Sequence, residues 1–275
     1  MKRLERSSIV LLLISCFLAL VIGLFAPLQA WRCELGTLQF STLAHVKAES
    51  ALVAPPLPLP QIHPLPSRLA SWRRTQASGD YFDQVAPTDV GYLIWSDFPV
   101  QIFVEGHANP TANPAELERA RIWQEAILQA VKEWNQYLPL ELVAKPESAD
   151  ILIWRSTPPL QSAKTPNNPR RARSAETRYE LYVRQLPTAT SPQLAHRCII
   201  QLSPSQSAQH LIAAARHELG HALGIWGHSP LESDALYFAQ VRYPPPISER
   251  DINTLKRIYE QPTRLGWTLP SPVTP

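Results

Sequence analysis

Three histidines and one glutamate lie close together in the sequence, at spacings that suit a metal ion. The stretch 217–228 reads HELGHALGIWGH. Residues four apart lie on one face of a helix, so His217 and His221 can direct two imidazoles at one ion. Glu218 lies beside that face, where it can accept a proton from a water molecule on the metal. The pattern predicts a metal-dependent hydrolytic site with Glu218 as the general base.

The third ligand that we expect is His228. Gly224 can end the helix by adopting a left-handed conformation, which turns the chain back toward the ion. Gly227 offers a second flexible point, and the apolar Ile225 and Trp226 between the two glycines should pack inward. Catalytic zinc has three protein ligands and one open position, whereas structural zinc has four protein ligands. The three histidines therefore predict one catalytic Zn²⁺.

Residues 1–30 are typical of an export signal or a membrane anchor. Basic residues precede an apolar run over residues 9–28, and Leu-Gln-Ala at 28–30 suits a cleavage site. If it is not removed, the run is long enough to span a bilayer and would be a membrane tether. A lipidation site at Cys16 is disfavoured because the apolar run continues past it. We expect an exported protein that is secreted, periplasmic or anchored on the extracytoplasmic side.

The 28 prolines divide the rest of the 275-residue chain. We predict a proline-rich linker or pro-segment at 31–78, a folded domain that carries the metal site at 79–262 and a proline-rich tail at 263–275. The net charge of +3, with no basic stripe, argues against a nucleic-acid partner. The sequence gives no indication of the oligomeric state.

Two cysteines remain if the signal is removed. In an oxidising compartment Cys33 and Cys198 could form a disulfide. Alternatively, the Cys33 thiolate could bind the metal and inhibit the site.

The secondary-structure pattern predicts an α+β fold. Runs rich in β-forming residues predict strands at 99–105, 140–143, 149–154, 178–184 and 198–202. Asn113, Pro114 and Glu116 form a capping pattern for a long first helix. Either Ser205 or Ser207 can cap the active-site helix, and a C-terminal helix begins near Ser248. We expect a twisted mixed sheet of four to five strands with these three helices packed against it.

The motif HELGHALGIWGH resembles the signature of the metzincin zinc peptidases, and it is most similar to that of matrixin-type catalytic domains. The strands and helices over residues 80–262 follow one another in the order that such a domain uses. The resemblance implies a zinc endopeptidase acting on a protein or peptide substrate. A peptide would extend the sheet along an edge strand such as 178–184.

The chain departs from that family pattern in two places. The third histidine lies one residue later than usual, which leaves Asp234 as a reserve ligand and Glu249 as a more remote one. The methionine that lies beneath the metal in metzincins is replaced by Leu236, which supplies a similar apolar volume. The next residue, Tyr237, could belong to this turn or stabilise an oxyanion.

Two further expectations concern metal content and activity. Residues 151–231 contain no aspartate, so we predict that no calcium is bound there. The shifted histidine and the missing methionine motivate an alternative function, in which the chain is a catalytically inactive zinc-binding envelope protein or an interaction module.

Overall fold

The computed structural model of the chain describes residues 56–74, 77–106, 111–160, 173–185 and 191–270. No helix within these ranges is both long and apolar enough to cross a bilayer. The signal or anchor predicted at 1–30, including the run at 9–28, and Cys33 lie outside the described residues.

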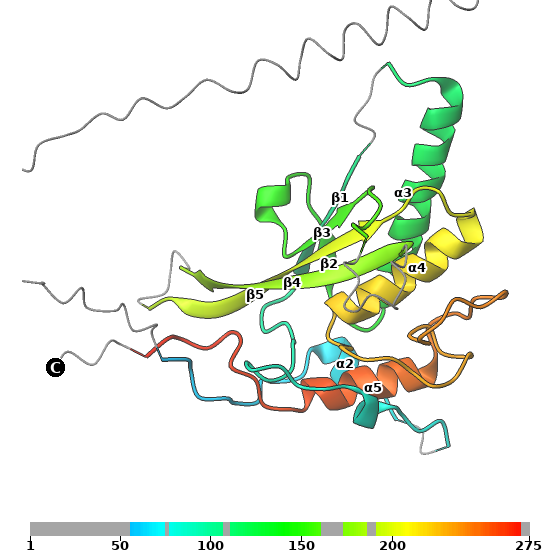
Figure 1. Cartoon of the computed structure of the whole chain (residues 1–275). Coiled ribbons are helices and arrows are strands. Elements are labelled where there is room, and N and C mark those ends of the chain that lie inside the picture. Colours follow the sequence, from blue (N-terminus) through cyan, green and yellow to red (C-terminus); the bar gives the residue numbers. More distant parts are fainter. Residues whose placement is uncertain (1–55, 75–76, 107–110, 161–172, 186–190, 271–275) are drawn as a thin grey trace, which may run out of the picture. The chain divides into compact units, whose positions relative to one another are not determined.

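A five-stranded mixed sheet lies at the centre of the fold (Figure 1). Its strands lie in the order β2 (Leu140–Leu142), β1 (Val100–Val104), β3 (Ile151–Trp154), β5 (Gln193–Leu202) and β4 (Ala175–Arg184). The first four strands run parallel, whereas β4 runs antiparallel to β5 along one edge. The α+β class, the mixed sheet and the number of strands are confirmed, and the strand predicted at 178–184 is an edge strand.

Two long helices pack against each other beside this sheet. The helix α3 (Pro114–Trp134) begins with the predicted capping box at Asn113, and α4 (Ala208–Ala222) begins after Ser207. Glu133 of α3 accepts a hydrogen bond of 2.9 Å from Arg216 of α4. The ion pair fixes the position of α4 along α3 immediately before the predicted ligand His217.

A third helix and several short elements complete the domain. The helix α5 (Glu249–Tyr259) begins with a capping box made by Ser248 and Asp251. The helix α2 (Ser67–Ser71) and the 3₁₀ turns η2 (Phe82–Gln84) and η3 (Pro146–Ser148) are short. In Figure 1, α2 lies beside α5.

Residues 57–74 are part of the packed domain rather than a linker. Leu69 is completely buried in the core. The Trp72 indole donates to the Asn253 side chain (2.9 Å), and Lys256 donates to the backbone carbonyl of Trp72 (2.7 Å). The prediction of a linker over 31–78 is therefore wrong for this part, because Leu69 is buried in the core and Trp72 is hydrogen-bonded to two residues of α5.

The C-terminal boundary was also predicted too narrowly. Thr263 is completely buried, and its backbone pairs with that of Gln61. The His63 ring donates to the carbonyl of Leu265 (2.8 Å) and stacks on Trp267 at 4.2 Å between ring centroids. The packed unit extends beyond 79–262 at both ends, because the two proline-rich segments pair with each other and with the domain.

Candidate metal centre

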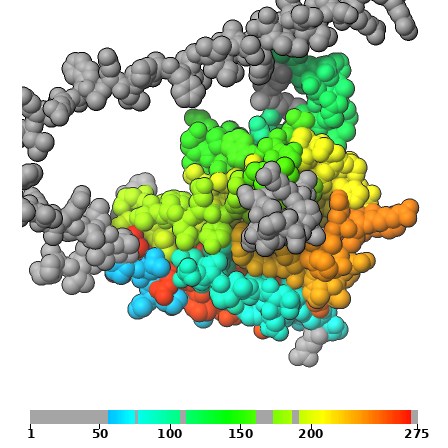
Figure 2. All heavy atoms as spheres, viewed as in Figure 1, coloured from blue at the N-terminus to red at the C-terminus, as the bar shows by residue number. Residues whose placement is uncertain are grey.

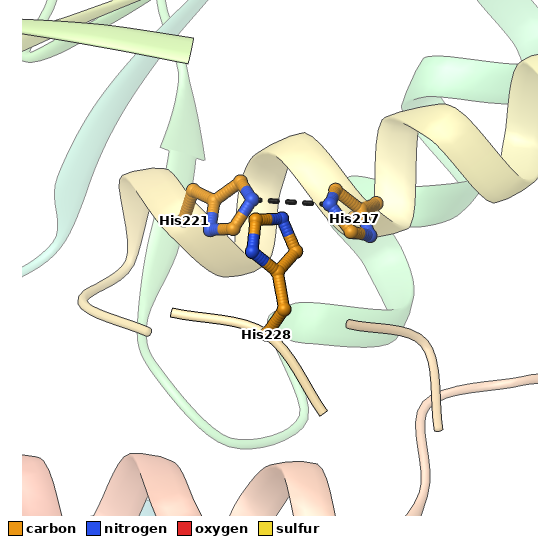
Figure 3. Close-up of side chains that lie close together, drawn as sticks. All are labelled: His217, His221 and His228. Carbon is orange, nitrogen blue, oxygen red and sulfur yellow. Dashed lines mark hydrogen bonds between the residues drawn. The ribbon is translucent and has the colours of Figure 1, made fainter. Parts of the chain in front are cut away.

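The three predicted ligands converge on one point (Figure 3). His217 and His221 project from the same face of α4, and His228 reaches them from the segment that follows the helix. One ring nitrogen of each histidine lies within 4.8 Å of those of the other two. Among the described residues, these three form the one group of histidine, cysteine or carboxylate side chains that could hold a metal ion.

Backbone carbonyls fix the orientation of two of the rings. The carbonyl of Ala235 lies 3.0 Å from Nδ1 of His217, and the carbonyl of Ile225 lies 2.7 Å from Nδ1 of His221. A carbonyl can only accept, so each Nδ1 carries the proton and each Nε2 presents a lone pair. The two Nε2 atoms lie 3.0 Å apart. Two facing lone pairs at this distance repel each other, and a shared cation would remove that repulsion.

All of the pKa shifts resolved in this group favour neutral imidazoles. Burial lowers the pKa of His221 well below its usual value, and the nearby His217 adds to the effect. The pKa of His228 falls to about 4, because desolvation and the neighbouring His217 both disfavour a second positive charge. Neutral histidines are the form that binds metal, so no proton has to be displaced from these two residues at neutral pH.

The chain after α4 brings His228 back to the site. Gly224 has φ = +130°, a conformation that favours glycine, and Ile225 is completely buried, as expected. Gly227 is required for another reason. A Cβ atom there would lie 2.2 Å from the carbonyl oxygen of Gln84, whose neighbour Val85 pairs with Gly227. The sequence predicted a flexible point at Gly227, whereas the structure shows a close approach between two backbone segments.

The reserve ligand Asp234 is occupied elsewhere. Asp234 is 1% exposed. Arg250 donates to Oδ2 (3.0 Å) and Ser248 donates to Oδ1 (2.8 Å), while Ser229 donates a further short hydrogen bond. Asp234 therefore holds the residue that follows His228 instead of joining the metal group. The more remote candidate, Glu249, lies in the first turn of α5 and accepts a hydrogen bond from Ser78.

A tight turn lies beneath the metal-binding helix. Its Leu236 is completely buried and so close to α4 that a Cβ atom on Gly220 would lie 2.6 Å from Cδ2 of Leu236. Leu236 thus makes the apolar contact with α4 that is expected of it. Tyr237, at the end of the turn, lines a cavity together with His217.

Glu218 lies in the same cavity, and its side chain is 8% exposed. Burial raises the pKa of its carboxyl group, although His217 and a hydrogen bond from Thr177 counteract part of the shift. The Thr177 hydroxyl donates to Oε2 of Glu218 over 2.6 Å. A buried carboxylate with a raised pKa and one hydrogen-bond donor is suited to accepting a proton.

The cavity extends from the metal group along α4. Its volume is about 170 Å³, and it reaches His210. Residues of α4 form one wall of the cavity, and the segment 234–245 forms another. This segment (orange in Figures 1 and 2) projects from the side of the domain between α4 and α5. The cavity is large enough to take a group the size of one amino-acid side chain beside His217 and Glu218.

Sequence reasoning did not find Thr177 and did not settle the role of Cys198. Thr177 lies 41 residues from its partner Glu218 in the sequence, and it reaches Glu218 because β4 lies beside α4 in the fold. Cys198 is a free cysteine, 1% exposed, and its thiol lies 3.8 Å from the carbonyl of Ala222. Burial raises the pKa of this thiol. Because the sulfur lies in the core, a disulfide with Cys33 would require the core to open.

Comparison of the sequence with models of known protein families finds no match, and comparison with curated proteins finds none either. The metal group and its surroundings therefore carry the functional argument by themselves.

Proposed function

We propose that this chain is an exported, zinc-dependent endopeptidase of the metzincin type. The observation that carries the proposal is the convergence of three imidazoles beside the buried carboxylate of Glu218, all next to one cavity. The hydrophobic N-terminal run predicts the export.

The donor set fits zinc. Zinc prefers nitrogen ligands at ~2.0–2.1 Å, and a catalytic site keeps a fourth position open. Two nitrogens bound tetrahedrally to one zinc lie about 3.3 Å apart, close to the 3.0 Å between Nε2 of His217 and Nε2 of His221. Hard ions such as calcium and magnesium prefer oxygen ligands, which this group lacks. The prediction that no calcium is bound within 151–231 stays a prediction.

Each residue of the site has a defined task in peptide hydrolysis. The three histidines would hold the ion, and zinc bound there would lower the pKa of a water molecule and polarise a carbonyl. Glu218 takes the proton from the attacking water and passes it to the leaving amine. Tyr237 lines the cavity beside His217 and is the candidate donor to the developing oxyanion.

The substrate would bind along the outer edge of β4, which pairs only with β5 among the described residues. Residues Ser174 and Ala175, at the start of this strand, line the same cavity as His217 and Glu218. A peptide that adds a strand to β4 would therefore pass the metal group and place one side chain in the cavity.

The test is hydrolysis of casein or gelatin by the full-length protein, with and without a metal chelator, beside Glu218→Gln. This substitution keeps the side-chain volume but removes the proton acceptor, so hydrolysis should fall by about 10² or more while zinc stays bound. Hydrolysis that is equal in the variant, or that the chelator leaves unchanged, would contradict the proposal. Stoichiometric zinc without turnover on a broad peptide library would instead favour the inactive zinc-binding module.

A further inference from the structure

The hydrogen bond between Thr177 and Glu218 joins the edge strand to the helix that carries the metal ligands. The Thr177 hydroxyl lies 2.6 Å from Oε2 of Glu218 and 3.1 Å from the backbone carbonyl of the same residue. A hydroxyl has one proton, and an ionised carboxylate is the stronger acceptor. The short distance to Oε2 is typical of a charge-assisted hydrogen bond.

Thr177 is held firmly in its own strand. It lies within β4 opposite Ile200 of β5, and the pairing with β5 continues along the strand before and after this position, which fixes its backbone. Its β-branched side chain has few rotamers. The hydroxyl is therefore a fixed point from which the carboxylate of Glu218 can be oriented.

The carboxylate of Glu218 needs a fixed hydrogen-bond partner because a glutamate side chain has three rotatable bonds. Glu218 is 8% exposed, so little water is available to solvate it. With Oε2 bound to Thr177, Oε1 remains to take a proton.

We propose that Thr177 is a positioning residue for Glu218. Its hydroxyl holds Oε2 and so aims Oε1 into the cavity beside His217. This inference rests on the proposed function, because it assigns to Glu218 the proton transfer of peptide hydrolysis. In this proposal β4 has two roles. It orients the general base through Thr177, and it is the strand along which the substrate binds.

The test compares Thr177→Val and Thr177→Ser with the wild type in the full-length protein. Valine has nearly the same shape but no hydroxyl, whereas serine restores the hydroxyl without the methyl group. In Thr177→Val, kcat should fall at least about tenfold while KM stays within about twofold, because the charge-assisted hydrogen bond is lost but the substrate contacts remain. Thr177→Ser should recover most of the lost kcat, and both variants should bind zinc as the wild type does.

A matched control removes a threonine hydroxyl elsewhere. Thr157→Val breaks the contact with Ser203 (3.1 Å) and should leave kcat and KM unchanged. If Thr177→Val leaves kcat unchanged in a protein that hydrolyses peptides, or lowers it only through a loss of zinc, the positioning role is overturned.

A second measurement does not depend on activity. The ¹³C signal of the Glu218 carboxyl carbon, assigned by its absence in Glu218→Gln, should shift in Thr177→Val and return toward the wild-type position in Thr177→Ser. An unchanged signal in Thr177→Val would overturn the contact itself. Absence of hydrolysis by the wild type, with the expected signal shift, would instead count against the proposed function and leave the contact standing.

Discussion

The buried carboxylate of Asp251 accepts a hydrogen bond of 2.9 Å from the backbone amide of Ala235. The carbonyl of the same Ala235 accepts the proton of Nδ1 of His217. Ala235 of the tight turn thus connects α5 to the metal ligand His217. The Tyr81 hydroxyl donates to the other oxygen of Asp251 (2.6 Å), so the N-terminal part of the domain supports the site as well.

The first prediction concerns this support. Asp251→Asn places an NH₂ donor where two backbone amides and a phenol already donate, so the turn beneath His217 should shift. Groups that orient metal ligands typically contribute 10–100-fold to metal affinity, and we expect a loss of at least about tenfold here. Zinc affinity measured against a competing chelator checks this. The control Glu260→Gln, which removes a surface ion pair with Arg74 beyond the other end of α5, should leave the affinity unchanged.

The second prediction concerns the proline-rich segment 57–74 at the start of the domain. Leu69→Ala should lower the free energy of unfolding by about 2–5 kcal/mol, because it empties a completely buried position. Leu59→Ala in the same segment should change it by less than about 0.5 kcal/mol, since Leu59 is 77% exposed. Urea unfolding of the two variants measures both. If Leu69→Ala changed the free energy of unfolding as little as Leu59→Ala, the segment would not be part of the cooperatively unfolding domain.

The third prediction concerns the dependence of stability on pH. His196 is 3% exposed and stacks on Trp95 at 3.9 Å between ring centroids. Burial, with a contribution from the positive charge of Arg184, lowers its pKa to about 3. In the unfolded chain its pKa is about 6.5, so between these values the unfolded state binds the additional proton. The native state therefore loses stability as the pH falls below about 6.5.

The measurement is urea unfolding of the metal-free protein at pH 7.5 and pH 5.0, beside His196→Phe. Phenylalanine keeps an aromatic ring against Trp95 but cannot titrate. The wild type should lose about 2 kcal/mol more than the variant on acidification, because the shift contributes about 1.4 kcal/mol for each pH unit. Equal losses would show that His196 is not buried as a neutral ring.

The fold was predictable where local patterns agree with tertiary packing. The capping box at Asn113, the apolar run at 151–154 and the spacing of His217 and His221 each determine a local structure that the domain retains. The position of His228 was also predictable, because two glycines with apolar residues between them leave few paths for the chain.

Two kinds of feature could not be predicted. The packing of Trp72 depends on Asn253 of α5, which lies 181 residues further along the chain, and a proline-rich composition hides such single contacts. The orientation of Glu218 depends on Thr177, whose side chain carries no local signal of its role. Both features arise when distant segments meet, and a periodicity within one segment cannot reveal them.

The central claim is that His217, His221 and His228 together hold one zinc ion. Its most direct test is the zinc content of the full-length protein after dialysis against micromolar zinc, measured for the wild type, His228→Ala and the control His210→Ala. His210 lies on the same helix and lines the same cavity, but it is not part of the metal group. We expect one zinc per chain in the wild type and in His210→Ala, and a large loss in His228→Ala. A wild type without zinc, or a His228→Ala variant that retains it fully, would contradict the account.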